Sequence, residues 1–294
     1  MNEKNSYIYV TLSILLWGTA ASIAKLLLKN LNNLQILLFT SLIAAITLFL
    51  ISAFQNKLKL IKKYKIKDYV TFAYMGFIGI FLYYILFFGA LMNAPAQNVV
   101  IVNYTWPICV VIFAIILLKD VFSMKKIFAL VLSFVGVYIV TTKGDLLNFF
   151  VTYDKGILFA LAGAICYALF SVLGKKYNYE RFTSMMFFYA FTFIFILITV
   201  LIFSKIPQIS LYELAGLLWL GIFTSGLAFV FWFLALKYGD TAKVSNVLFL
   251  TPFISLIYIH FLVGEKILLS SIIGLIFIVI GILIQSKNNK ITTA

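Results

Sequence analysis

The chain has 294 residues, a net charge of +14, 64% hydrophobic residues and only 11% charged residues. Soluble domains contain about 45–50% apolar and about 25% charged residues, so this composition excludes a soluble fold and indicates that lipid surrounds much of the chain. The basic residues lie between apolar runs and form no continuous basic face, which argues against nucleic acid as a partner.

Ten apolar stretches, each about long enough to cross a bilayer as an α-helix, follow one another along the chain. We expect them at residues 6–28, 34–53, 68–92, 96–118, 125–142, 156–175, 183–203, 211–236, 243–263 and 268–286. The first run is too long for a signal-peptide core, and no small-residue cleavage site follows it. The sequence therefore predicts an all-α membrane protein with ten transmembrane helices.

Lys and Arg are distributed unequally between the two sides that this topology defines. With the N-terminus inside, 17 of the 23 basic residues fall on the inner side and 6 on the outer side, and the densest group is at 57–67. Basic residues concentrate on the cytoplasmic side of membrane proteins. We therefore expect both termini to be cytoplasmic.

The two halves of the sequence resemble each other at an offset of 145 residues. The matched pairs are Gly76 with Gly221, Ala90 with Ala235, Leu91 with Leu236, Val99 with Val244, Val102 with Val247, Pro107 with Pro252, Asp120 with Glu265 and Gly136 with Gly281. The first helices align at an offset of 150, where Trp17 meets Tyr167 and Lys25 meets Lys175. The sequence thus predicts a duplicated unit.

Because five is an odd number of spans, the second copy of the unit begins on the other side of the membrane and has the opposite orientation. We therefore expect two inverted five-helix repeats, residues 1–145 and 146–294, in one bundle. Inverted repeats are typical of secondary transporters, in which the halves rock about a midplane site. The alternative is a ten-helix protein with no transport role.

Polar groups inside the membrane are costly and mark interior sites. The densest group lies in the fourth predicted span, where Gln97 and Asn98 are followed by Asn103, Tyr104 and Thr105. Pro107, which follows them, removes a backbone donor and predicts a bend, and Pro252 predicts a second bend at the matching position. We interpret both prolines as hinges beside a cavity; the alternative is packing kinks remote from substrate.

Several aromatic residues lie near the middle of predicted spans, where an interfacial belt does not explain them. Trp17, Trp106, Tyr167 and Trp232 belong to this group, and Tyr83 and Tyr84 are further candidates in the third span. Asn103 and Trp106 share a helix face, whereas Tyr104 and Trp106 would diverge on an ideal helix. These residues are candidate substrate contacts, with ordinary helix packing as the alternative for each.

All nine acidic residues fall at or near span ends, and none is mid-membrane. A carrier of small cations or protons would normally need a buried carboxylate, so the sequence favours neutral or zwitterionic substrates. His260 lies toward the end of its span, where packing explains it better than proton transfer. Lys25 and Lys175 can extend to the interface, or alternatively bind a substrate carboxylate.

No catalytic chemistry is evident in the sequence. There is no nucleophile–base pair, no phosphate-binding glycine motif and no metal-ligand spacing, so we expect no enzyme activity, cofactor or metal. Cys109 and Cys166 both lie within apolar runs and are interpreted as small buried hydrophobic residues.

With these features in view, the whole chain resembles the drug/metabolite transporter superfamily of the EamA type. Trp17-Gly18 and Pro252 followed by Gly264-Glu265 carry the likeness, and the stretch Ile101–Pro107 is similar to a helix of the YddG-type aromatic amino acid exporters. The segment 163–168 departs from that subgroup, because Tyr167 stands where a tryptophan is expected. The resemblance implies a central cavity lined by Tyr83, Tyr104, Trp106 and Tyr167.

The sequence thus predicts a transporter that exports aromatic or other large neutral amino acids across the bacterial cytoplasmic membrane. Its partners would be a small-molecule substrate and the bilayer, and the sequence specifies no oligomeric state. Two alternatives remain. An aromatic cage could carry quaternary ammonium or aromatic cations, and a membrane sensor that transports nothing would leave substrates immobile.

Overall fold

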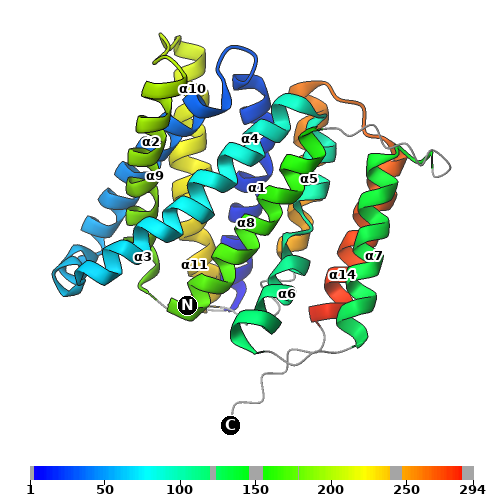
Figure 1. The fold of residues 1–294 in the computed structure, drawn as a ribbon, viewed down its shortest axis with the longest axis horizontal. Coiled ribbons are helices and arrows are strands. Elements are labelled where there is room, and N and C mark those ends of the chain that lie inside the picture. The colour runs from blue at the N-terminus through cyan, green and yellow to red at the C-terminus, as the bar shows by residue number, and fades with distance from the viewer. Residues whose placement is uncertain (1–2, 120–123, 146–154, 178, 239–246, 287–294) are drawn as a thin grey trace.

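The computed structural model describes residues 3–119, 124–145, 155–177, 179–238 and 247–286, and this part of the chain contains only helices (Figure 1). The first half forms α1 (Glu3–Leu27), α2 (Asn33–Phe54), η1 (Lys57–Lys63), α3 (Ile66–Gly76), η2 (Phe77–Leu82), α4 (Tyr83–Asn93), α5 (Ala96–Asn103), α6 (Trp106–Leu118) and α7 (Met124–Thr141). The second half forms α8 (Lys155–Tyr177), α9 (Arg181–Phe203), α10 (Leu211–Leu218), η3 (Trp219–Leu227), α11 (Ala228–Tyr238), η4 (Leu248–Leu250), α13 (Thr251–Tyr258), η5 (Ile259–Val263) and α14 (Leu269–Ser286).

The observed helices follow the predicted apolar stretches closely. In the described residues, 7 helices are long and apolar enough to cross a membrane, and three shorter apolar helices cover Val131–Val140, Leu248–Val263 and Leu269–Ile284. Residues 243–246, which open the predicted ninth span, and 120–123, between the fourth and fifth, lie outside the described residues.

The helix ends follow local capping rules. Asn32 caps α2, because its side chain accepts from the backbone of Gln35 while the Gln35 side chain accepts from the backbone of Asn32. Ser210 and Glu213 make the same reciprocal pair at the start of α10. Unpaired N–H groups at a helix start must find acceptors, and these side chains supply them.

Two long helices contain a widened turn at matching places. The helix 66–93 passes through the π-helical segment η2, and the helix 211–238 passes through the π-helical segment η3. A π segment shifts every following side chain around the helix axis relative to an ideal α-helix. The residues after each segment, Tyr83 in the first half and Phe229 in the second, thereby face the centre of the bundle.

The outside of the bundle is strongly apolar. Large hydrophobic side chains such as Phe134, Phe203 and Phe261 are 73%, 76% and 78% exposed. Soluble monomers rarely expose contiguous apolar surfaces of this kind, whereas a bilayer solvates them. The exterior therefore matches a lipid-facing surface.

The helix contacts between the two halves come in matching sets. The first helix of each half packs against the later helices of the other half: α1 contacts α11 and α13, and α8 contacts α4 and α6. The remaining large contacts join equivalent helices directly, α2 with α9 and α7 with α14. This exchange is the pattern expected if the halves are related by a two-fold axis.

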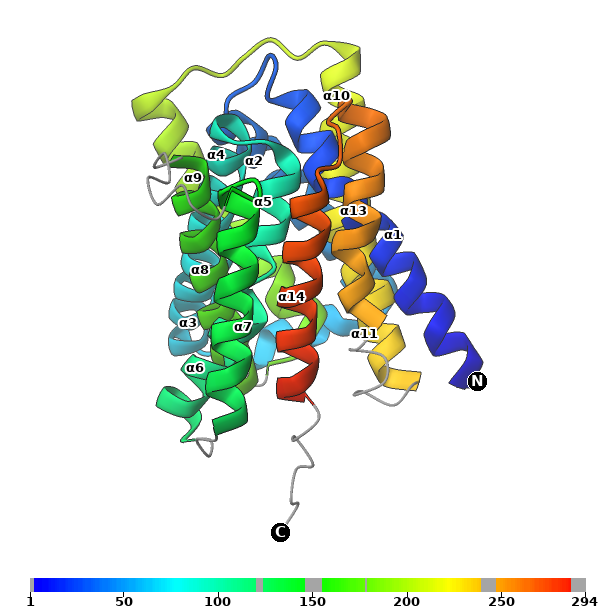
Figure 2. The same cartoon turned by 90° about the vertical axis from the view of Figure 1, so that its right-hand side faces the viewer.

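Equivalent helices run in opposite directions. Lys25, near the end of α1, and Gly156, near the start of α8, both lie against the segment that ends α4. In the same way, Asn32 before α2 donates to Ser204 after α9 over 3.0 Å. The first turn of α1 and the last turn of α14 lie at the same end of the bundle (Figure 2).

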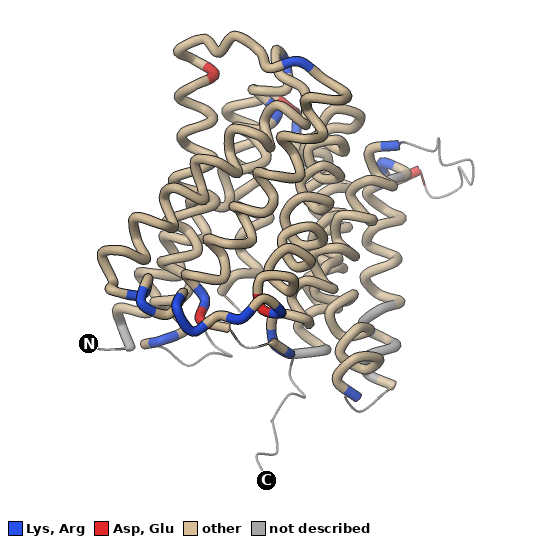
Figure 3. The backbone as a smooth tube through the Cα atoms, turned by 60° about the vertical axis from the view of Figure 1, so that its left-hand side comes forward, with Lys and Arg blue, Asp and Glu red and all other residues tan. Residues whose placement is uncertain are grey.

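The two ends of the bundle differ in charge. Lys and Arg gather at the end that carries the first turn of α1 and η1, and few lie at the other (Figure 3). We call these the lysine-rich end and the opposite end, the latter defined by Asn32, Ala94 and Glu265. By the bias of basic residues toward the cytoplasm, the lysine-rich end corresponds to the side on which the sequence predicts the termini.

The helices α7 and α14 touch through their backbones. A Cβ atom on Gly136 would lie 2.6 Å from the carbonyl oxygen of Gly274, and one on Gly274 would lie 2.6 Å from that of Gly136. Small residues permit such close approach between membrane helices. This crossing joins one helix of each half along the side of the bundle (Figure 1).

Candidate functional site

The fourth predicted span is broken in the middle. Helix α5 ends at Asn103 and α6 begins at Trp106, because Pro107 has no N–H to donate into the preceding turn. The chain bridges the gap with shorter-range bonds, from Thr105 N–H to the Val102 carbonyl at 3.1 Å and from Ile108 N–H to the Thr105 carbonyl at 3.0 Å. The break turns Tyr104 and Trp106 toward the same space.

A second break stands at the matching position in the other half. The short 3₁₀ helix η4 ends at Leu250, and α13 begins at Thr251 with Pro252 in its first turn. The carbonyl of Leu248 accepts from the hydroxyl of Thr251 at 2.7 Å and from the hydroxyl of Tyr104 at 3.2 Å. The tyrosine thus links the two broken helices directly.

The breaks border a central cavity of about 330 Å³, which we call the inner compartment. The sequence-predicted residues that line it are Trp17, Tyr83, Tyr84, Asn103, Tyr104, Trp106, Tyr167 and Trp232. Pro107 and Pro252 are buried behind the wall, which their neighbours Trp106 and Thr251 form. The structure therefore brings all these proposed contacts together and sets both prolines beside them.

One wall of the inner compartment consists of rings in mutual contact. Tyr167 on α8 lies 5.1 Å from Trp106, edge to face, and 5.1 Å from Tyr83 in a tilted arrangement, measured between ring centroids. Tyr83 in turn stacks on Phe87 at 5.8 Å. Such ring pairs prefer these geometries and fix one another's orientation.

The facing wall comes from α1 and α11. Trp17 meets Phe229 edge to face at 5.2 Å and Trp232 at 6.3 Å. The indole N–H of Trp17 donates to the carbonyl of Thr224 at 3.0 Å, inside the π segment η3. This bond holds the indole in one orientation.

Asn103 supplies the amide group of the inner compartment. It accepts from the hydroxyl of Tyr83 at 3.3 Å and donates to the carbonyl of Ala160 at 3.4 Å, and its side chain is buried. Both bonds are long for their type, so an incoming polar ligand can compete for them. The amide therefore presents a donor and an acceptor within an otherwise aromatic lining.

A second cavity of about 400 Å³, the outer compartment, adjoins the inner one and shares Tyr167, Ser171, Phe229 and Trp232 with it. Its lining extends to Lys175 and Arg181, which are exposed at the lysine-rich end. The two compartments together run from the bundle centre to this end. Among the described residues, no acidic side chain lines either compartment.

At the opposite end, two charged side chains cap helix termini. The ammonium of Lys25 donates to the carbonyls of Leu91 and Ala94, the latter at 2.9 Å, where α4 ends. The carboxylate of Glu265 accepts from the backbone N–H groups of Ala96 at 2.8 Å and Gln97 at 3.1 Å, where α5 begins. Each charge matches the helix terminus that it caps.

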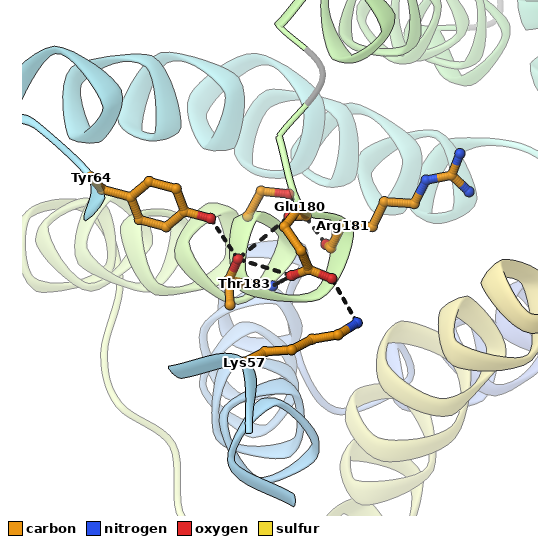
Figure 4. A network of polar contacts seen from close by, with 6 residues as sticks. Lys57, Tyr64, Glu180, Arg181 and Thr183 are labelled. Carbon is orange, nitrogen blue, oxygen red and sulfur yellow. Dashed lines mark hydrogen bonds and ion pairs between the residues drawn. The ribbon is translucent and has the colours of Figure 1, made fainter. Parts of the chain in front are cut away.

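The lysine-rich end carries a separate network (Figure 4). Glu180 pairs with Lys57 at 2.7 Å, accepts from the backbone of Thr183 at 2.8 Å and so caps α9. Burial alone would raise the pKa of Glu180, but the bonds from Lys57 and Thr183 outweigh it and hold this pKa below its usual range. Burial raises the pKa of Tyr64, whose hydroxyl shares a bond of 2.7 Å with that of Thr183.

Four further wall residues were not singled out from the sequence. Ser171, Phe229, Thr251 and Ser255 all line the inner compartment. Ser171 follows Tyr167 by one helical turn, Thr251 directly precedes Pro252, and Ser255 follows Thr251 by one turn, so their spacing from Tyr167 and Pro252 could have found these three. Phe229 had no such neighbour pattern among the 31 phenylalanines.

Comparison with known proteins gives a consistent family. The EamA-like transporter family matches residues 4–142 and again 154–286. An uncharacterized transporter of Clostridium kluyveri is 24% identical over 98% of this chain and 94% of its own length, and the uncharacterized transporter YyaM of Bacillus subtilis is 27% identical over 97% and 95%. A solved protein structure with 20% sequence identity superposes with a TM-score of 0.69 and covers 97% of both chains.

Proposed function

This chain belongs to the EamA-like transporter family, a family of multi-pass membrane proteins that are not enzymes, and we propose that it exports aromatic or other large neutral amino acids. The observation that carries the proposal is the inner compartment, where rings from α1, α4, α6, α8 and α11 enclose one buried amide. Stacking and apolar contact would select the side chain, and Asn103 would orient the polar end of the substrate.

The size and lining of the cavity support a small substrate with a flat or bulky apolar part. Ligand pockets in proteins span about 300–1,000 Å³, and the inner compartment lies near the lower limit with about 330 Å³. Trp106 and Tyr167, which meet edge to face, both line this cavity and can contact an aromatic substrate there. An amino acid side chain fits this space better than a large amphiphile does.

The positive charge at the mouth of the outer compartment supports a substrate that bears a carboxylate. The two basic side chains at the mouth, Lys175 and Arg181, would attract an acidic group, and none of the described residues in the lining is a carboxylate that could hold an isolated cation. A zwitterion approaching from the lysine-rich end would therefore meet cations first and the ring-lined compartment second.

The proposed architecture is ten transmembrane helices in two inverted repeats, residues 1–145 and 146–294. The matching helix contacts and the opposite directions of α1 and α8 support this division. With both termini in the cytoplasm of a bacterial cell, the outer compartment would open to the cytoplasm. Export then requires the halves to rock until the compartment faces outward, with the breaks at Pro107 and Pro252 as hinges.

A second candidate substrate class is supported by the same rings. Aromatic faces attract quaternary ammonium ions by about 2 kcal/mol or more when desolvated. The basic mouth would repel such cations, which is why we rank this class second. A sensor that moves no substrate is the third candidate, and it predicts no flux at all.

Flux through reconstituted liposomes separates the three candidates. Purified protein should move labelled tryptophan, phenylalanine or methionine, and unlabelled aromatic amino acids should compete while choline-like compounds should not. The Trp106→Ala variant should lose selectivity among these substrates and stay folded, and Phe134→Ala on the lipid-facing side of α7 serves as the control. Competition by choline-like compounds alone would assign the cation class, and absence of flux for the whole panel would remove the transport proposal.

A further inference from the structure

The contact of Lys25 with the end of α4 replaces a backbone hydrogen bond that the helix lacks. The carbonyl of Leu91 would ordinarily accept from the N–H four residues later, but that residue is Pro95, which has none. The Lys25 ammonium donates to Leu91 and to Ala94 instead. A buried carbonyl without a donor is costly, and Leu91 is fully buried, so this lysine stabilises the present arrangement of the helices.

A second charged side chain caps the helix on the other side of Pro95. Glu265 receives the first two N–H groups of α5, directly after Pro95. Lys25 therefore joins α1 to the end of α4, while Glu265 joins the segment after η5 to the start of α5. Helices that would have to separate to open the opposite end are thereby tied together.

The matching lysine of the other half lies in a different situation. Lys175 on α8 corresponds to Lys25, and Leu236 at the end of α11 corresponds to Leu91. Lys175 and Leu236 both line the outer compartment at the lysine-rich end. Lys175 is exposed, and no hydrogen bond or ion pair joins it to any described residue. Lys25 thus caps a helix at the opposite end, whereas Lys175 caps no helix end among the described residues at the lysine-rich end.

We propose that Lys25 and Lys175 close the two ends in turn, each by capping the carbonyls at the end of the opposing helix, α4 or α11. The inference rests on the proposed alternating access. In the present state Lys25 caps α4 and the opposite end is shut. When the halves exchange their arrangements, Lys175 forms hydrogen bonds to the carbonyls at the end of α11, and the hydrogen bonds from Lys25 to the carbonyls of α4 break.

The two lysines are positioning residues in this proposal, because each acts on a helix end and neither lines the inner compartment where the substrate would bind. A surface lysine that only extends to the headgroups would have no preferred carbonyl, and its removal would leave the balance of states unchanged. A cap that exists in one state only shifts the equilibrium by its differential free energy. Removing Lys25 and removing Lys175 must therefore shift the balance in opposite directions.

Cysteine labelling measures that balance without any substrate. In a Cys109→Ala, Cys166→Ala background, the matched reporters are Ala21→Cys and Ser171→Cys, which occupy equivalent positions and line the inner compartment. A membrane-impermeant maleimide is applied from one side of oriented vesicles at a time. In the parent protein, Ser171→Cys should react from the lysine-rich side, and Ala21→Cys should react only slowly from the opposite side.

Lys25→Met should raise labelling of the Ala21→Cys reporter from the opposite side and lower labelling of Ser171→Cys from the lysine-rich side. Charged hydrogen bonds of this kind correspond to about a tenfold change in the ratio of states. Lys175→Met should do the reverse, and the double variant should return toward the parent ratio. Lys29→Met and Lys176→Met, which remove neighbouring exposed lysines, are the matched controls.

Shifts in the same direction for both variants, or shifts no larger than those of the controls, would overturn the proposal. If Lys25→Met does not fold, Lys25→Gln keeps an amide donor on a shorter stem and should still raise labelling of Ala21→Cys from the opposite side. Amino acid flux with unmoved labelling would remove this inference alone. Opposite shifts without amino acid flux would keep it and remove the substrate assignment.

Discussion

The indole of Trp106 meets the ring of Tyr167 edge to face, with centroids 5.1 Å apart and planes at 83°. This contact joins α6, which starts at a proline break, to α8, the first helix of the other half. Because the rings belong to different halves, any movement of one half against the other changes the wall that they form. The pair therefore links the shape of the cavity to the arrangement of the halves.

Replacing Tyr167 tests the ring wall. Tyr167→Ala should raise the KM for labelled tryptophan by about 3- to 10-fold, because aromatic contacts contribute about 0.5–1.5 kcal/mol beyond their buried area. Tyr167→Phe keeps the ring and should leave the KM nearly unchanged. In a double-mutant cycle with Trp106→Ala, the loss of the double variant should be smaller than the sum of the two single losses. Equal effects of Phe and Ala at position 167 would contradict a stacking role.

Replacing Asn103 tests the polar end of the site. Asn103→Leu preserves much of the volume and removes both the acceptor for Tyr83 and the donor to Ala160. Tryptophan binding, measured by competition for flux, should weaken by about 3- to 10-fold, as expected for lost hydrogen bonds. Competition by indole, which has the ring but no amino or carboxyl group, should not change. A comparable loss for both compounds would show that Asn103 supports the wall and does not orient the substrate.

Gly76 provides a test of packing between α3 and α9. A Cβ atom there would lie 2.6 Å from the carbonyl oxygen of Phe188, so Gly76→Ala forces backbones apart and should destabilise the protein by about 1–3 kcal/mol. Gly174→Ala is the control, because its nearest neighbour would be the Met75 side chain at 3.9 Å. Its stability should be unchanged or slightly higher, since alanine favours helix. Thermal unfolding in detergent compares the two, and equal Tm values would contradict the close approach.

The pair of Glu180 and Lys57 predicts a pH dependence. The pKa of Glu180 is lowered in the folded protein, so its contribution to stability is present above the unfolded value and is lost as pH falls through the folded value. Glu180→Gln should therefore lower the Tm at about pH 7, and the difference from the parent protein should shrink toward about pH 3.5. A difference that stays constant across this range would show that the carboxylate charge has no part in the network.

The spans were predictable because the bilayer sets their length. Residues 34–53 were expected to form a helix and Asn33–Phe54 do so, since a run of apolar residues about as long as the hydrocarbon core has few other stable structures. The clustering of Trp17, Asn103 and Trp106 in one cavity was also foreseeable, because polar and aromatic groups in mid-span avoid lipid.

Local distortions were beyond the reach of periodicity. Tyr104 and Trp106 diverge on an ideal helix, yet both line the inner compartment because the chain unwinds between α5 and α6. The π segments that turn Tyr83 and Phe229 inward leave no clear mark in an apolar sequence. The contact of Lys25 with Leu91 joins residues 66 apart, so it depends on tertiary packing alone.

The glycine crossing of α7 and α14 has a mechanical consequence. Two backbones that touch without intervening side chains leave no room to slide closer, and their separation would open a dry gap that lipid tails fill poorly. The contact between α7 and α14 is thus expected to stay fixed while the rest of each half moves. Two halves joined along this edge can separate at one end of the bundle or at the other, but not at both ends at once.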